Sequence, residues 1–260
     1  MVQRPAHRPR KRFGQHFLEA EAVLERIAAA LALARQDRVF EIGPGRGALT
    51  AVLARESDHV VVVEIDRDLV ELLRRRFPGV EVVSADVLKI DLATLLGDRG
   101  DARVVGNLPY NISTPLLGRL RTVTTAVRDM HFMLQKEVVD RLAASPGSKD
   151  WGRLSVMMRA AFDVEPLFDV EPEAFRPRPK VRSTFVQLIP HARCAITDHD
   201  VFARVVRDAF QQRRKRLSNA LQSWPMDWSR VGVDPALRPD AVDLDGYIAI
   251  ANHLAARQLG

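Results

Sequence analysis

The chain has 260 residues, a formal net charge of +6, an isoelectric point of about 10 and 47% hydrophobic residues. This length and apolar content suffice for one large folded domain and a smaller one. No apolar run approaches the ~20 residues that span a membrane, and residues 1–11 lack the apolar stretch of a secretory signal. Cys194 is the only cysteine, which excludes an internal disulfide and a cysteine-based metal cluster. We therefore expect a cytoplasmic protein without a metal site.

The excess of positive charge predicts a polyanionic partner only where basic residues cluster. One cluster falls in residues 1–12, which we predict to be a flexible basic arm. The second comprises Arg213, Arg214, Lys215 and Arg216, which we expect on a helix that contacts RNA phosphates. The alternative for both clusters is a solvated surface without a partner.

The first half of the chain begins a pattern of alternating helices and strands. Helical periodicity over residues 19–34 is followed by a strand at 38–42, a glycine-rich loop at 43–47 and a helix at 48–54. A strand, a glycine loop and a helix in this order are typical of the nucleotide-binding start of a doubly wound α/β sheet. Glycines allow a ligand to approach the backbone closely, and the helix N-terminus suits a carboxylate.

Acidic residues follow the next two predicted strands. The strand 59–64 ends at Glu64, and the strand 80–83, which comes after a helix at 67–77, is followed by Asp86. An acid at the first position could accept both ribose hydroxyls of an adenosine, and Asp86 could accept its adenine amine. The alternative for Glu64 is a strand-terminal acid that faces water.

The strand 102–106 leads into Asn107, Leu108, Pro109 and Tyr110. Proline lacks an N–H and restricts the residue before it, so the strand ends sharply here. The turn offers an amide, a bare carbonyl and an aromatic ring, which suit an amine attached to a flat ring. The alternative is an ordinary loop between a strand and a helix.

The pattern after residue 110 predicts further helices and strands, and near residue 193 it changes from alternating helices and strands to helices alone. We expect Ser113 to cap a helix that starts at Thr114. Later elements are a strand at 127–135, helices at 136–143 and 153–162, a strand at 183–189, and helical segments after 198 that include 201–221. The predicted domains are an arm (1–12), an α/β domain (13–192) and a helical RNA-binding domain (193–260).

Several longer stretches point to a known family. They are FGQHFL at 13–18, EIGPGRGALT at 41–50, EIDRDL at 64–69, GNLPYNISTP at 106–115, MHFMLQKEV at 130–138, GRLSVM at 152–157, FRPRPKVRS at 175–183 and FQQRRKRLSNAL at 210–221. In these stretches the chain resembles the KsgA/RsmA small-subunit rRNA adenine dimethyltransferases, relatives of the Erm methylases. His16, where asparagine is frequent in that family, and Arg46 depart from the common pattern.

The resemblance implies a Rossmann-like class I S-adenosylmethionine-dependent methyltransferase with a small C-terminal all-α domain. It implies dimethylation of two adjacent adenosines in the 3′-terminal hairpin loop of 16S rRNA, on the immature small ribosomal subunit, with S-adenosyl-L-methionine as methyl donor. It also implies a checkpoint role in ribosome biogenesis, and we expect a monomer. The positions that match the family's cofactor-binding residues are His16, Leu18, Gly43, Glu64, Asp86 and Asn107.

For catalysis, our hypothesis is that the Asn107 side-chain oxygen and the Leu108 carbonyl accept the two amine hydrogens of the target adenine. Pro109 would fix the direction of that carbonyl, and Tyr110 and Phe175 would stack on the two faces of the base. Two alternatives are an Erm-like 23S rRNA adenine methyltransferase and a mainly non-catalytic assembly factor. A small-molecule methyltransferase fits the basic helical tail poorly.

Overall fold

The computed structural model describes residues 15–192 and 195–258, so the predicted arm at 1–12 lies outside the described residues. The described chain forms two compact units. The first runs to Val139 and resumes with Glu165–Pro190, and the second contains Asp140–Val164 and the chain from His191 onward. Among the described residues, no helix combines the length and the apolar character needed to cross a bilayer.

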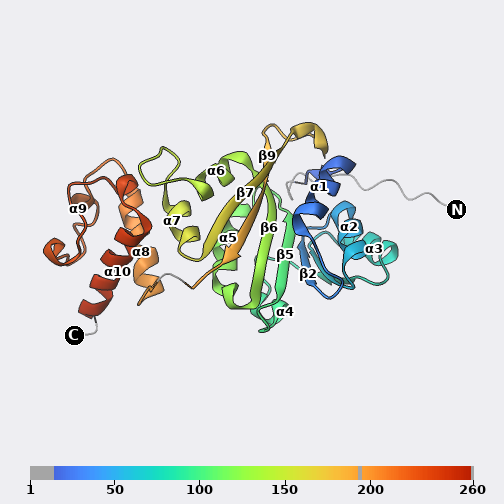
Figure 1. The fold of residues 1–260 in the computed structure, drawn as a ribbon, viewed down its shortest axis with the longest axis horizontal. Coiled ribbons are helices and arrows are strands. Elements are labelled where there is room, and N and C mark those ends of the chain that lie inside the picture. Colours follow the sequence, from blue (N-terminus) through green and yellow to red (C-terminus); the bar gives the residue numbers. More distant parts are fainter. Residues whose placement is uncertain (1–14, 193–194, 259–260) are drawn as a thin grey trace. The chain divides into compact units, whose positions relative to one another are not determined.

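A seven-stranded sheet organises the first unit, with the strand order β4-β3-β2-β5-β6-β9-β7 (Figure 1). β2 pairs in parallel with β3 on one side and with β5 on the other, and β6 continues the parallel part before the antiparallel β9. The chain therefore moves outward from β2 to β4 and then crosses to β5, which makes the β2–β5 edge a topological switch point. The bounds are β2 Arg38–Ile42, β3 His59–Glu64, β4 Glu81–Ser84, β5 Ala102–Asn107, β6 Val127–Gln135, β7 Phe162–Val170 and β9 Ser183–Pro190.

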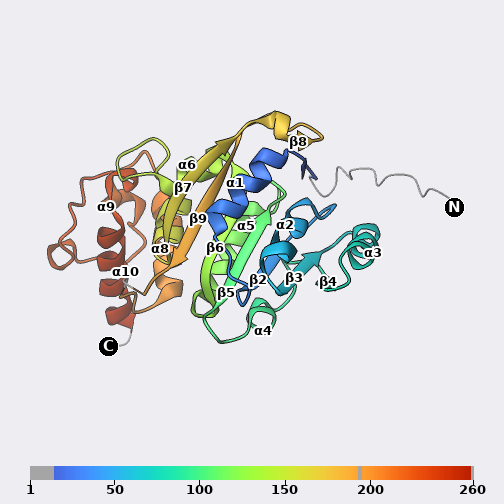
Figure 2. The same ribbon diagram turned by 45° about the vertical axis from the view of Figure 1, so that its right-hand side comes forward.

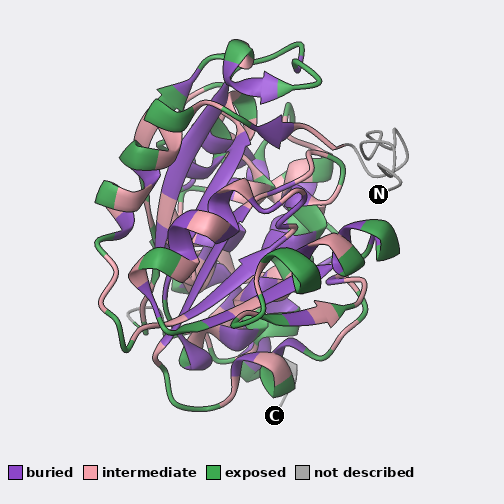
Figure 3. Ribbon diagram, turned by 90° about the vertical axis from the view of Figure 1, so that its right-hand side faces the viewer, coloured by how far each residue is buried: buried purple, intermediate pink, exposed green. Residues whose placement is uncertain are grey.

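Helices cover both faces of this sheet. Figures 1 and 2 show α1 and α2 on one face and α5 on the other, and Figure 3 shows the buried strands between helices with exposed outer surfaces. This layering explains why the central strands are almost entirely apolar, because both of their faces are covered. The helices of this unit are α1 Glu21–Leu31, α2 Ala48–Glu56, α3 Arg67–Arg76, α4 Leu92–Leu96 and α5 Ser113–Leu120; α6 Lys136–Ala143 starts in it, and α7 Arg153–Arg159 belongs to the second unit.

A buried arginine joins the start of the parallel sheet to α1. Arg103 in β5 donates from Nε to both carboxylate oxygens of Asp129, at 3.0 and 3.1 Å, and from Nη1 to Asp37 at 2.8 Å. Its Nη2 donates to the Leu31 carbonyl at the end of α1. Because three acceptors surround the guanidinium, the charge is compensated although the side chain is almost completely buried.

Two predicted helix boundaries were wrong in detail. Ser113 is the first residue of α5 and Ile112 is its N-cap, since the Ile112 carbonyl already accepts from the Leu116 N–H at 2.9 Å; the Ser113 hydroxyl donates instead to the Pro109 carbonyl at 3.1 Å. The helix predicted at 153–162 ends at Arg159, and Phe162 starts β7, a strand that the sequence did not predict. Pro166 and several charged residues obscure its pattern, and they are tolerated because β7 is an edge strand.

Two short strands form a separate antiparallel ribbon. β1, Phe17–Leu18, pairs with β8, Phe175–Arg176, so that Leu18 lies opposite Phe175. This pairing brings together two segments of the chain that are more than 150 residues apart in sequence. The sequence did not predict either strand.

The second unit is helical and has its own apolar core. It contains α8 His199–Gln211, α9 Leu217–Ala220 and α10 Leu244–Gln258, and its largest fully buried side chains include Trp151, Phe202 and Tyr247. Residues 140–164 belong to this unit, whereas the predicted division assigned them to the α/β domain. The Trp151 indole explains this difference, because it packs in the helical core and donates to the Val242 carbonyl at 2.9 Å.

The helix predicted over 201–221 is interrupted at the basic cluster. α8 ends at Gln211 and α9 starts at Leu217, so the four basic residues lie in the turn between them and not on a helix. Arg213 makes an ion pair with Asp240 at 3.1 Å and donates to the Lys149 carbonyl at 2.8 Å. These contacts stabilise the turn, and a helix that continued through Arg213 would lose them.

We expect Gly106→Ala to destabilise the α/β unit. A Cβ at Gly106 would lie 2.6 Å from the Ile42 carbonyl oxygen of the neighbouring strand, and a backbone atom in a sheet cannot move away easily. The free energy of unfolding in urea should fall by about 1–3 kcal/mol. The matched control is Gly118→Ala in α5, where no neighbouring atom lies within 4 Å, and which should be stabilising by about 0.5–1 kcal/mol. Equal stabilities of the two variants would contradict this interpretation.

Candidate active site

A cavity of about 370 Å³ opens where β2, β3, β4 and β5 end. All of the expected cofactor positions line it, as do Leu108, Pro109 and Tyr110, so the structure brings these predicted residues together. Its place at the carboxyl edge of the sheet, beside the switch point, is where open α/β sheets bind ligands. The basic residues 213–216 belong to the second unit and do not line the cavity.

The glycine loop after β2 forms the floor of the cavity. Gly45 has φ of +58°, and a Cβ there would lie 2.8 Å from Cδ1 of Phe17. Only glycine therefore suits both the backbone conformation and the contact with β1. The N–H groups of Gly43, Gly45 and Gly47 donate to the Val63 carbonyl, the Glu64 carboxylate and the Pro44 carbonyl, so the loop is held in one shape beside the ligand space.

Glu64 at the end of β3 connects the glycine loop to the segment that follows β3. Its Oε2 accepts from the Gly45 N–H at 3.2 Å, and its Oε1 accepts from the N–H groups of Ile65 and Asp66, both at 2.9 Å. Burial raises the pKa of the Glu64 carboxyl, and these three hydrogen bonds partly offset that effect. The side chain is therefore held in one orientation at the wall of the cavity.

Asp86 occupies the corresponding position after β4. Its Oδ1 accepts from the Leu88 N–H at 3.0 Å, and its Oδ2 lies 3.9 Å from the Lys89 ammonium. The carboxylate thus lines the cavity at the outer end of the strand series. Asp86, Glu64 and the glycine loop place their polar groups along one edge, in the order of the strands β4, β3 and β2.

At the end of β5, the Asn107 side chain has a defined orientation. Its Nδ2 donates to the His16 carbonyl at 2.9 Å. A carbonyl oxygen can only accept, so the amide nitrogen must face His16 and the Oδ1 must point the other way. The next residue is also fixed, because the Leu108 N–H donates to the Met133 carbonyl of β6 at 3.2 Å.

Tyr110 is held from two sides. Its hydroxyl is hydrogen-bonded to the Ser183 hydroxyl at 2.8 Å, and its ring stacks on the His16 imidazole with centroids 5.4 Å apart. His16 in turn donates from Nδ1 to the Pro177 carbonyl at 2.7 Å. Burial raises the pKa of the Tyr110 phenol, so the ring stays uncharged. One face of the tyrosine is therefore covered by His16.

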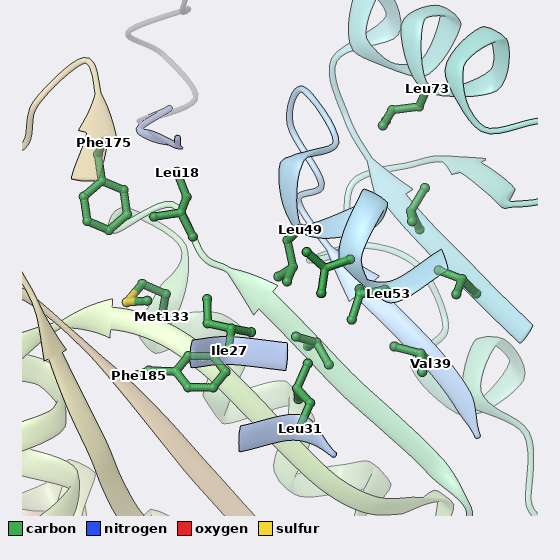
Figure 4. Packing of buried hydrophobic residues seen from close by; sticks show 14 of the residues in the cluster. Leu18, Ile27, Leu31, Val39, Leu49, Leu53, Leu73, Met133, Phe175 and Phe185 are labelled. Atoms are coloured by element: carbon green, nitrogen blue, oxygen red, sulfur yellow. The ribbon is translucent and has the colours of Figure 1, made fainter. Parts of the chain in front are cut away.

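Phe175 does not have the predicted position. We expected it to stack on a substrate base, but its side chain is only 1% exposed and belongs to the apolar core. Figure 4 shows its ring near Leu18 and Met133, beneath the ribbon formed by β1 and β8. Phe175 pairs with Leu18 of β1 and does not line the cavity, whereas Tyr110 does.

Comparison with known proteins agrees with this geometry. Residues 6–233 match the family described as ribosomal RNA adenine dimethylase. The chain belongs to this family. It is 48% identical over 262 residues to the ribosomal RNA small subunit methyltransferase A of Pseudomonas fluorescens, covering 98% of this chain and 97% of that protein. The protein of the same name from Bordetella pertussis is 49% identical over 257 residues, which cover 96% of each chain.

Solved structures confirm the predicted fold of this adenine dimethylase. A dimethyladenosine transferase from Plasmodium falciparum superposes with a TM-score of 0.79 at 23% identity, covering 94% of this chain and 98% of that one. The 23S rRNA methyltransferase ErmE gives a TM-score of 0.69 at 25% identity, covering 92% and 99%. The Rossmann-like methyltransferase fold expected from the sequence is therefore present.

In this adenine dimethylase, Glu41 also lines the cavity, and the sequence analysis assigned it no role. Its carboxyl lies at the base of the cavity, is 1% exposed and accepts from the Thr50 hydroxyl at 2.5 Å. Burial raises its pKa to about 8, and the nearby Glu64 carboxylate contributes in the same direction. The signal in the sequence is an acid two residues before the glycine loop, within a strand whose other charged residue, Arg38, stands at its start.

We expect Glu41→Gln to remove a pH-dependent component of the stability. The wild-type carboxyl binds its proton more tightly in the folded state, so its stabilising effect is complete below the ordinary pKa of 4.5 and is lost as pH rises toward about 8. Over this window the free energy of unfolding of the wild type should fall relative to the variant, by at most about 1.4 kcal/mol per pH unit. Urea unfolding of both proteins at several pH values measures the difference. A difference that is constant with pH would contradict the assignment.

Proposed function

We propose that this protein transfers methyl groups from S-adenosyl-L-methionine to the exocyclic nitrogens of two adjacent adenosines in the 3′-terminal hairpin loop of 16S rRNA. The observation that carries the proposal is the orientation of the Asn107 side chain. Its Nδ2 donates to the His16 carbonyl, so its Oδ1 faces the other way and can accept a hydrogen bond from the target amine. The names of the full-length bacterial relatives support the small subunit as the source of the RNA.

The cavity residues suit the proposed methyl donor. Glu64 and Asp86 provide carboxylate oxygens for ribose hydroxyls and an adenine amine, and the glycine loop allows close approach to the backbone. His16, Leu18 and Gly43 complete the binding positions, with Asn107 at the end where transfer takes place. The bound donor supplies a methyl group on a sulfonium, which is strongly electrophilic.

The chemical difficulty lies in the target nitrogen, whose lone pair is delocalised into the adenine ring. We assign the two acceptors for its hydrogens to the Asn107 Oδ1 and the Leu108 carbonyl. Both are held before substrate binds, since Asn107 donates to His16 and the Leu108 N–H donates to Met133. Two acceptors draw the nitrogen toward tetrahedral geometry and make its lone pair available.

Pro109 and Tyr110 complete the proposed base site. The ring of Pro109 fixes the turn after Leu108 and offers no competing N–H. Tyr110 would stack on the adenine through the face that His16 does not cover, and Ser183 holds the phenol in place. The methylated nitrogen is strongly acidic, so its proton passes to water or a nearby acceptor and no dedicated base is needed.

We also propose that the second unit binds RNA through the turn after α8. Arg214, Lys215 and Arg216 are exposed there, whereas Arg213 is half-buried and held by Asp240. The three exposed cations are therefore the ones available for phosphates, and Arg213 keeps the turn in shape. Three adjacent exposed cations without an intervening acid would contact a polyanion at several points.

The decisive experiment is transfer of labelled methyl groups to small subunits that lack these modifications, followed by mapping of the modified nucleotides. We expect dimethylation of two adjacent adenosines near the 3′ end. Large-subunit RNA serves as the parallel substrate, because an Erm-like activity would label it instead. Absence of transfer to either RNA, with retained binding to immature small subunits, would favour a non-catalytic assembly factor and a checkpoint role alone.

Asn107→Ala and Glu64→Ala should fail at different steps. Loss of the amide oxygen in Asn107→Ala should lower methyl transfer at least 100-fold while S-adenosylhomocysteine binding weakens only in part, because positioned acceptors of this kind contribute about 10²–10³ in rate. Glu64→Ala should instead lose measurable binding in calorimetry, since it removes the acceptor at the ribose position. Wild-type turnover of Asn107→Ala would contradict the mechanism.

Neutralising the exposed cations should reduce the salt dependence of RNA binding. For a variant with Arg214, Lys215 and Arg216 all changed to Gln, the slope of log affinity against log salt concentration should become shallower by about 2. The matched control changes Arg35, Arg55 and Arg99 to Gln, three exposed cations at the amino-terminal edge of the sheet. An equal change in the control would show that only net charge matters.

A further inference from the structure

Arg46, in the glycine loop, occupies an unusual place at the mouth of the cavity. Its guanidinium lies over the Phe17 ring, 4.6 Å from the centroid, and its Nη1 makes an ion pair with Glu19 at 3.3 Å. Arg46, Phe17 and Glu19 all line the cavity. Arg46 departs from the pattern common in the family, and the proposed mechanism does not use it.

A second arginine fixes the backbone at this position. Arg76, at the end of α3, donates from Nη1 to the Arg46 carbonyl at 2.8 Å and also lines the cavity. The aromatic contact and this hydrogen bond hold the Arg46 guanidinium at the rim, although its side chain is 36% exposed. These contacts place the guanidinium beside the space that a ligand of the cavity would occupy.

The order of the strands indicates which part of the methyl donor reaches this rim. Asp86 and Glu64 follow β4 and β3, so the adenine and ribose extend over the outer strands. Asn107 follows β5, and the sulfur must lie near it for transfer to take place. The third branch at the sulfur is the α-amino acid chain. The space that remains for it lies between β1 and the glycine loop that follows β2, beside Arg46 and Glu19.

We infer that Arg46 and Glu19 bind the α-amino acid end of the methyl donor, Arg46 through the carboxylate and Glu19 through the ammonium. This inference rests on the proposed function. A zwitterion carries one charge of each sign, which matches the two side chains, and a guanidinium can serve two carboxylates at once. An RNA phosphate at the same place carries only negative charge and would be repelled by Glu19.

The test compares two ligands that differ only in this end of the molecule. S-adenosylhomocysteine carries the amino acid chain, and 5′-methylthioadenosine keeps the adenine, ribose and sulfur but lacks it. Calorimetry of Arg46→Met should show about a tenfold loss of affinity for S-adenosylhomocysteine, the factor expected for one hydrogen bond to a charged group, and no change for 5′-methylthioadenosine. Glu19→Gln should show the same selectivity with a smaller loss.

Arg75→Met is the matched control, because Arg75 is exposed on α3, carries the same charge and does not line the cavity. It should leave both affinities unchanged. An equal loss of both ligands in Arg46→Met, or no loss of either, would overturn the inference, and a loss confined to RNA binding would assign Arg46 to a phosphate. If the wild-type protein binds neither ligand, the proposed function itself fails, so the two failures are distinguishable.

Discussion

The hydrogen bond from the Asn107 side chain to the His16 carbonyl is the contact on which the rest of the site depends. It joins the end of β5 to the segment that enters β1, two parts of the chain separated by more than 90 residues. It also determines which end of the amide is left as an acceptor. The stack of His16 on Tyr110 and the hydrogen bond of His16 to the Pro177 carbonyl extend the same connection to the 175–183 segment.

Buried ionisable groups occur at both edges of the sheet, and each is compensated in a different way. Glu64 is held by three backbone N–H groups, Glu41 by the Thr50 hydroxyl, and Arg103 at the opposite edge by two carboxylates. Desolvation dominates at both glutamates and raises their pKa values, because neither has a cation beside it. The cavity wall therefore combines fixed geometry with a reduced tendency to carry charge.

Local patterns in the sequence predicted the parallel strands and the residues that follow them. β2 and β3 have the predicted bounds, and the glycine loop, Glu64, Asp86 and Asn107 line one cavity as expected, because the carboxyl ends of parallel strands meet at one edge. The predictions failed where a residue's partner lies far away in sequence. Phe175 is buried where β8 pairs with β1. Arg213 lies in the turn after α8, where it forms an ion pair with Asp240.

The sequence by itself determined the doubly wound sheet and the set of residues at the strand ends, because hydrophobic periodicity and turn residues act over a few neighbours. The resemblance to the family rested on the longer motifs. Only the tertiary structure decided the direction of each side chain and its partners. The burial of Glu41, the grouping of residues 140–164 with the helical unit and the cation of Arg46 over Phe17 all arise from packing between distant segments. Such contacts depend on the three-dimensional arrangement of both partners, which no local pattern contains.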